Sequence, residues 1–240
     1  MNRAHTDREY EGELRRVREQ VLTMGAKVEE MLDAAVRALA ERDSDLARAT
    51  MASDQVINRL EVEIDGLCLR VLAKRQPVAS DLRFLTMALK LVTDLERMGD
   101  LVVNICERVV ELNEEPPLKP YVELVTMAEV AHQMLHAVLD AFLAGDVAAA
   151  ERVIERDADV DALYASIFRE LLTYMMENPR NIYRATRVQS IAKYVERIAD
   201  HTTNLGEMVV FMVRGKDIRH SGRLPSRERG ERKSGRPPVS

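Results

Sequence analysis

Hydrophobic residues recur at steps of three and four along almost the whole chain, and this spacing limits the fold more than any other feature of the sequence. In the first segment the apolar positions are Leu14, Val17, Val21, Met24, Val28, Met31, Leu32, Ala35 and Leu39. Because an α-helix has about 3.6 residues per turn, these side chains share one helical face. No proline interrupts the first 76 residues. The sequence therefore predicts long amphipathic helices.

Capping residues, glycine and proline mark the ends of these helices. The largest break is the Pro-rich stretch 113–120, and the others lie at residues 41–45, Gln76-Pro77, Gly145-Asp146 and Asn178-Pro179. Asp and Asn side chains accept hydrogen bonds from free N–H groups at a helix start, glycine ends a helix, and proline fits the first helical position. We predict six helices, at roughly 8–42, 45–74, 78–113, 120–144, 146–176 and 180–214.

The second half of the chain repeats the first. Residues 93–112 and 193–212 share seven identities in twenty at an offset of 100, and residues 54–60 match 157–163 more weakly at an offset of 103. Two tandem antiparallel three-helix bundles explain both matches. We predict an all-α fold with one bundle within residues 1–116, the second within 117–215, and a disordered basic tail at 216–240.

Composition excludes several other classes of protein. Ten aromatic residues and few regularly spaced turns argue against a β-sandwich or barrel. The net charge of −5 divides into −11 for residues 1–213 and +6 for 214–240, so the body has no positive field for nucleic acid. We expect the tail to contact anionic lipid headgroups or an acidic partner surface.

Two cysteines and the absence of a long apolar run indicate where the protein works. Cys68 and Cys106 both lie in apolar periodic segments, which predicts reduced core thiols rather than a disulfide. No uninterrupted apolar run approaches the ~18 residues that span a bilayer. We therefore expect a cytoplasmic protein that reaches a membrane through a partner.

An acidic stripe follows the third predicted helix on the side away from its apolar face. Glu96, Asp100, Asn104 and Glu107 fall within roughly 80° of one another around the helix. The same residue types recur one hundred positions later, as Glu196, Asp200, Asn204 and Glu207. One explanation is a solvated face, for which Arg97 and Arg108 supply counter-charge.

A second explanation is metal binding, because the preceding helix of each half carries an acidic motif of the same spacing. These motifs are Asp54/Asn58 and Asp157/Asp161, and Glu61/Asp65 is an alternative pair. Carboxylate and amide oxygens are hard ligands that suit Mg²⁺, Mn²⁺ or iron, and zinc also accepts them. We expect the second half to be the better site, since Asn58 leaves the first half one carboxylate short.

Other arrangements point to chemistry less strongly. Glu129 and His132 form one Glu-x-x-His, whereas a ferritin-like di-iron site needs two. His132 and His136 lie one turn apart at the edge of an apolar face, which is more typical of a boundary contact than of a metal ligand. The sequence contains no phosphate-binding Gly-rich loop and no nucleophile motif. A binding protein is therefore favoured over an enzyme.

Three stretches resemble the PhoU family of phosphate-transport regulatory proteins. They are AKRQPVASDLRFLTMALKLVTDLERMGD, LLTYMMENPRNI and VERIADHTTNLGEMVVFMVRGKDIRH, and the similarity extends over about residues 8–220. The resemblance implies a tandem three-helix-bundle fold. It also implies a negative regulator of high-affinity phosphate uptake and of phosphate-starvation signalling.

The resemblance further implies partners and a cofactor. Family members contact the phosphate ABC transporter and its sensor histidine kinase at the inner membrane, so we expect an adaptor between the transporter ATPase and the kinase, working as a homodimer. Some members bind multinuclear iron or zinc on E(D)-x-x-x-D motifs, which correspond here to Asp54/Asn58 with Glu96/Asp100, and to Asp157/Asp161 with Glu196/Asp200. Asn104, Asn204, Glu107 and Glu207 are candidate extra ligands. The alternative function is a multi-carboxylate metalloprotein with a storage or catalytic role.

Overall fold

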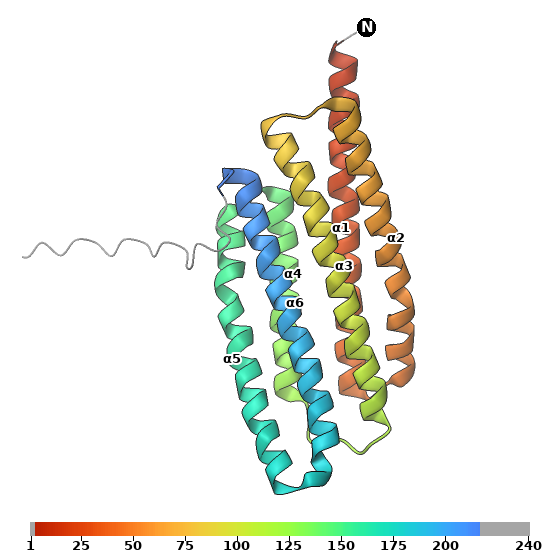
Figure 1. The fold of residues 1–240 in the computed structure, drawn as a ribbon, viewed down its shortest axis with the longest axis vertical. Helices are drawn as coiled ribbons and strands as arrows, with labels where there is room; N and C mark the ends of the chain where they lie inside the picture. The colour runs from red at the N-terminus through yellow and green to blue at the C-terminus, as the bar shows by residue number, and fades with distance from the viewer. Residues whose placement is uncertain (1–2, 217–240) are drawn as a thin grey trace, which may run out of the picture.

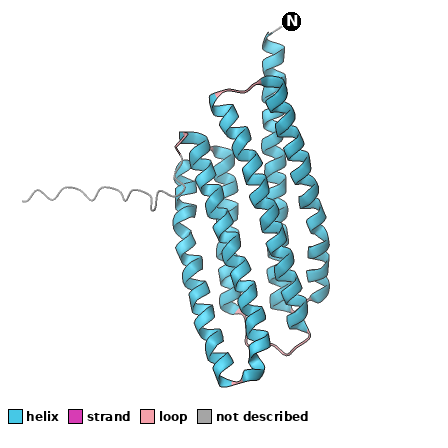
Figure 2. Ribbon diagram, viewed as in Figure 1, coloured by secondary structure: helices cyan, strands magenta, loops and turns pink. Residues whose placement is uncertain are grey.

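A computed structural model describes residues 3–216, with side chains from residue 8 onward. This part of the chain is mainly helical (Figures 1 and 2). The helices are α1 (Arg3–Glu41), α2 (Ser44–Arg75), α3 (Ala79–Asn113), α4 (Val122–Ala144), α5 (Val147–Glu177) and α6 (Ile182–Arg214), with a short 3₁₀ helix η1 (Pro179–Asn181) before α6. No β-strand occurs among these residues. The all-α prediction is confirmed.

Most helix boundaries coincide with the predicted capping residues. The Asp43 side chain accepts hydrogen bonds from the backbone N–H groups of Asp45 and Leu46, and the Asp146 side chain caps α5 by accepting one from the N–H of Ala149. Gly145 ends α4 in the left-handed conformation, with φ +64°. These contacts satisfy N–H and C=O groups that a helix end otherwise leaves free.

The starts of α4 and α6 lie two residues later than predicted, and two other boundaries differ as well. Helix α1 begins at Arg3 rather than near residue 8. Pro77 lies in the connection between α2 and α3 instead of at a first helical position, because Gln76 is left-handed (φ +48°) and ends α2. A residue that precedes proline is disfavoured in the right-handed helical region, so the helix ends there and the next one starts two residues after the proline.

Helices α1–α3 form one bundle and α4–α6 form the other, and the two bundles lie side by side (Figure 1). Helix α3 contacts α6, and α1 contacts α4. The buried side chains of both bundles form one continuous core. At Gly25 of α1 a Cβ atom would stand 2.6 Å from Leu139 Cδ1 of α4, so the missing side chain lets the two helices approach closely.

Both cysteines are free and buried, as the sequence predicts. Burial raises the pKa of the Cys68 thiol to about 11 and that of Cys106 to about 12. Because the thiolate is the reactive form, we expect iodoacetamide at pH 8 to label the native protein at least about tenfold more slowly than the urea-unfolded protein. Mass spectrometry of timed samples measures this, and equal rates in the two states would contradict it.

The predicted basic tail lies almost wholly outside the described residues, which end at residue 216. Within the described helices, none combines the length and the apolar character needed to cross a bilayer.

Candidate functional site: two acidic clusters

The first acidic cluster lies between α2 and α3 and consists of Asp54, Asn58, Glu61, Glu96 and Asp100. Asn58 Nδ2 donates to Asp54 Oδ2 at 2.9 Å. The other carboxylate oxygen, Asp54 Oδ1, is buried without a hydrogen-bond partner, and it lies 3.0 Å from where a Cβ would stand on Gly99 of α3. Asp54 therefore packs directly against the α3 backbone at a position that lacks a side chain.

The carboxylates of this cluster raise one another's pKa through charge repulsion, which places them near one another. Burial raises the pKa of Glu96, and Asp100, Glu61 and Asp54 raise it further. Burial also raises the pKa of Asp54, with an added effect of Asp100, and the pKa of Glu61 rises through burial and then through Asp65 and Asp100. Glu61, predicted only as an alternative ligand, thus belongs to this cluster.

The second acidic cluster occupies the equivalent place between α5 and α6 and consists of Asp157, Asp161, Glu196 and Asp200. Burial raises the pKa of Asp157 to about 6, and the negative charges of Asp161 and Asp200 raise it as well. The pKa of Asp200 is raised by burial and by Glu196. The motifs predicted from the repeat therefore face each other across neighbouring helices in both bundles.

The two clusters differ in their built-in counter-charge. Lys193 Nζ lies 2.5 Å from Glu196 Oε2 in the second cluster, and this contact raises the pKa of Lys193. The position one hundred residues earlier is Thr93, whose hydroxyl donates to the Leu89 carbonyl. Each cluster thus has four carboxylates, to which the first adds the Asn58 amide and the second adds Lys193.

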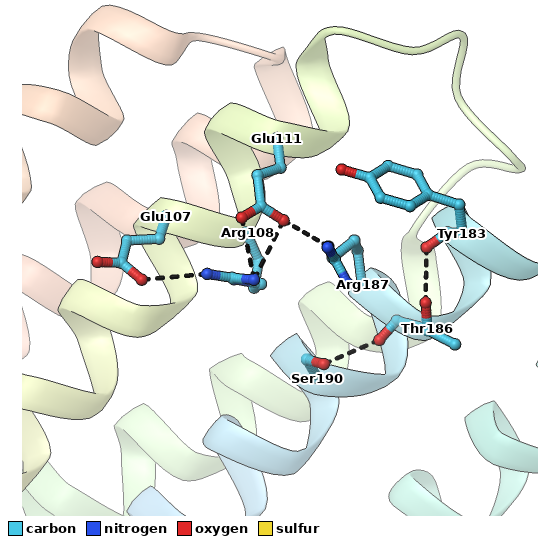
Figure 3. Close-up of polar contacts among 7 residues, drawn as sticks. All are labelled: Glu107, Arg108, Glu111, Tyr183, Thr186, Arg187 and Ser190. Carbon is cyan, nitrogen blue, oxygen red and sulfur yellow. Dashed lines mark hydrogen bonds and ion pairs between the residues drawn. The ribbon is translucent and has the colours of Figure 1, made fainter.

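The candidate extra ligands lie differently from the main motifs. Asn104 Nδ2 donates to the Asp100 carbonyl at 2.8 Å. Glu107 accepts a hydrogen bond from Arg108 at 3.2 Å, and Arg108 also donates to Glu111, which in turn pairs with Arg187 of α6 (Figure 3). Glu107 therefore belongs to a polar network that joins the two bundles. In the second half, Asn204 is exposed and Glu207 is half-buried.

The carboxylate and amide oxygens of the two clusters are ligands that suit a hard cation, although they do not converge on a single position. Oxygen ligands favour Mg²⁺, Mn²⁺ or iron over zinc, which prefers nitrogen and sulfur. The raised pKa values and the unpartnered Asp54 Oδ1 show negative charge that a cation would neutralise. Among the residues that the structure describes, no three His, Cys, Asp or Glu side chains are arranged to hold a metal ion.

A buried polar pair between the bundles was missed in the sequence. Asp94 Oδ1 of α3 and His201 Nδ1 of α6 lie 2.9 Å apart, and the two side chains are 9% and 12% exposed. The sequence does place Asp94 on the apolar face of its helix, between Leu91 and Leu95, which indicates a buried carboxylate. A carboxylate on a core face needs a partner, but only the packing of the bundles identifies His201 as that partner.

The comparisons with known proteins agree with this architecture. The PhoU domain family model matches residues 21–109 and 124–209, one match in each bundle. The chain is 42% identical over 219 residues to a phosphate-specific transport system accessory protein PhoU homolog of Pseudomonas putida, covering 91% of this chain and 86% of the relative. It is 40% identical over 218 residues to the Escherichia coli protein of that name, covering 91% and 90%.

Solved structures show the same fold. A crystal structure of PhoU from Pseudomonas aeruginosa superposes with a TM-score of 0.83 at 41% identity, covering 86% of this chain and all of that one. The phosphate transport system regulatory protein PhoU from Streptococcus pneumoniae superposes with a TM-score of 0.81 at 29% identity, covering 87% and 99%. With two domain matches, one for each bundle, and relatives at about 40% identity along most of its length, the chain belongs to the PhoU family.

Proposed function

We propose that this protein is a regulatory accessory protein of phosphate transport, which lowers high-affinity uptake and phosphate-starvation signalling when phosphate is plentiful. The observation that carries the proposal is the match of both bundles to the PhoU domain, together with about 40% identity to proteins named as phosphate-specific transport system accessory proteins. The role is regulatory rather than catalytic, and it is carried out in the cytoplasm.

The experiment is deletion of the gene in its own host, with a reporter under a phosphate-starvation promoter. In high phosphate we expect the reporter to switch on in the deletion strain and to return to its basal level when the gene is restored. A reporter that stays off in the deletion strain would contradict negative regulation. A purely structural scaffold predicts that result.

The finer mechanism that we propose is an adaptor that contacts the transporter ATPase and the sensor histidine kinase, and that works as a homodimer. Long exposed helical faces support contact with proteins, and the acidic clusters offer a surface to basic patches on a partner. The test is a pull-down of the untagged partners in high phosphate, with sedimentation to measure the oligomeric state. Failure to bind either partner would remove the adaptor mechanism while leaving the deletion phenotype to be explained.

We further propose that the acidic clusters hold iron or another hard cation, or zinc, on Asp54, Asn58, Glu96 and Asp100 in the first bundle and on Asp157, Asp161, Glu196 and Asp200 in the second. Bound metal would neutralise the carboxylates and tie the two helices of each cluster together. The buried, unpartnered Asp54 Oδ1 and the raised pKa of Asp157 support this. A metal-storage or catalytic role is the alternative function of such a site.

Metal analysis of protein purified without chelators or an affinity tag tests the metal proposal. We expect at least about one equivalent per chain, reduced by the double variant Glu196→Ala with Asp200→Ala. Asp159→Asn is the matched control, because Asp159 is exposed on α5 outside the cluster. Less than one equivalent, unchanged in the double variant, would leave the clusters as a docking surface only.

A further inference from the structure

The connection between α3 and α4 forms a pocket against the end of α1. It crosses the end of the molecule opposite the N-terminus (Figure 1). The pocket has a volume of about 360 Å³, and its walls include Leu39, Arg42, Pro117, Lys119, Pro120 and Tyr121. Sites for small molecules typically measure about 300–1,000 Å³ and combine apolar walls with a few polar groups. This pocket has that size and that kind of lining.

Arg42 brings to the pocket a positive charge that it does not share with a carboxylate. Among the described residues, its Nη2 atom donates to the backbone carbonyls of Leu112, Asn113 and Glu115 at 3.3, 3.1 and 2.6 Å. The other terminal nitrogen, Nη1, is buried without a hydrogen-bond partner. Every N–H group of a guanidinium is a donor, so Nη1 remains available to a further acceptor.

Tyr121 places a second unpartnered donor in the same pocket. The residue is only 8% exposed, and its hydroxyl is buried without a hydrogen-bond partner. A buried tyrosine hydroxyl usually has a partner, because an unpaired one loses its bonds to water. Arg42 and Tyr121 both line this pocket, so an oxygen atom of a ligand there would satisfy both donors.

Lys119 is the third polar residue of the pocket, but its charge is already balanced. Its side chain is 10% exposed and its Nζ donates to Glu170 of α5. Burial lowers the pKa of Lys119, and the negative charge of Glu123 opposes this effect. No carboxylate is found among the described residues that line the pocket itself. The free donors are therefore Arg42 Nη1 and the Tyr121 hydroxyl, and both favour an acceptor with negative charge.

We propose that this pocket binds a small organic anion, whose carboxylate or phosphate group accepts hydrogen bonds from Arg42 Nη1 and the Tyr121 hydroxyl. Arginine recognises both of these oxyanions, and the bonds that it donates to them are strong because both partners are charged. The apolar part of the ligand lies against Leu39, Pro117 and Pro120. Because Arg42 lies between α1 and α2 and Tyr121 precedes α4, a bound anion joins the first bundle to the second. The inference is independent of the proposed function, since it rests on these side chains alone.

The test is calorimetric titration of the full chain with benzoate, phenyl phosphate and inorganic phosphate in turn. We expect an organic anion to bind with a stoichiometry near one, and inorganic phosphate, which has no apolar part to bury, to bind at least about tenfold more weakly. Tighter binding of benzoate identifies a carboxylate ligand, and tighter binding of phenyl phosphate identifies a phosphate ester. Benzyl alcohol, which has the ring without the charge, should not bind.

The variant Tyr121→Phe separates loss of the site from loss of the fold, because it keeps the ring and removes only the hydroxyl. It should weaken binding of the organic anion about tenfold, through loss of a hydrogen bond to a charged group. The melting temperature of the ligand-free variant should equal or exceed that of the wild type, because the hydroxyl has no partner there.

Two further variants complete the test. Arg42→Gln removes the charge and should weaken binding by more than about tenfold. Tyr183→Phe is the matched control, because Tyr183 is exposed on α6 outside the pocket, and it should bind the anion as the wild type does. The proposal would be overturned if neither organic anion bound at millimolar concentration, if Tyr121→Phe bound it as tightly as the wild type, or if inorganic phosphate bound equally well.

Discussion

Replacing Asp94 with alanine is expected to lower the free energy of unfolding by about 3 kcal/mol. The change leaves the largely buried His201 ring, 12% exposed, without its 2.9 Å partner. A buried polar group that loses its partner typically costs about 1–3 kcal/mol, more if the group is charged. It also opens space in the interface between α3 and α6. Urea denaturation at pH 7, followed by circular dichroism, measures the loss.

A double-mutant cycle assigns this loss to the pair. If Asp94 and His201 act together, the variant that combines Asp94→Ala with His201→Ala should be more stable than the sum of the two single losses implies. Lys90→Ala is the control, since Lys90 is exposed on α3, and it should change stability by less than about 0.5 kcal/mol. Strictly additive losses would show that the two residues contribute separately.

Replacing Asp157 with asparagine is expected to raise the free energy of unfolding at pH 7 by roughly 1–2 kcal/mol. The pKa of Asp157 rises from its ordinary value near 3.8 to about 6 in the folded protein, so the fold disfavours the charged carboxylate. A shift of this size corresponds to about 3 kcal/mol at full effect, which partial exposure to solvent reduces. Asparagine keeps the shape and removes the charge.

The pH dependence of this gain follows from the direction of the shift. A carboxyl with a raised pKa in the fold binds its proton more tightly there than in the unfolded chain, so its destabilising effect grows as the pH rises from about 4 to about 6. The advantage of the variant should therefore be full above pH 6 and vanish near pH 4, as thermal unfolding across this range measures. Asp159→Asn is the control for removal of an exposed carboxylate from α5, and a lower stability of Asp157→Asn than of the wild type at pH 7 would contradict the prediction.

The secondary structure and the site motifs were accessible from the sequence because both depend on local spacing. Apolar periodicity and capping residues such as Asp43 and Asp146 predicted nearly every helix boundary. The boundary at Pro77 differs because the left-handed conformation of Gln76 ends α2 before the proline, and the start of α1 also differs, at Arg3 rather than near residue 8. Comparison of the two halves predicted that Asp157 and Asp200 lie on neighbouring helices, and the electrostatic coupling between them agrees.

The contacts between the bundles could not be predicted from the sequence. An internal repeat describes the structure of each bundle, but it carries no information on how the two bundles pack against each other. Asp94 and His201 have Tyr194 and Leu101 at the equivalent positions of the other half, so no repeated pattern marks them. The role of Glu107 likewise depends on Arg108, which donates to both Glu107 and Glu111, while Glu111 also accepts from Arg187 of α6 (Figure 3). Lys193 differs from these, because its contact with Glu196 lies within α6 at a spacing of three residues, and the comparison of the halves missed it only because the equivalent position is Thr93.

The placement of the acidic clusters has a mechanical consequence. Helices α2 and α5 lie on opposite outer sides of the molecule (Figure 1), and each contacts only elements of its own bundle. Each cluster joins such an outer helix to α3 or α6, the helices that hold the bundles together. A change of charge at a cluster therefore acts on the packing of an outer helix against α3 or α6, and not on the contacts among α1, α3, α4 and α6 that join the two bundles.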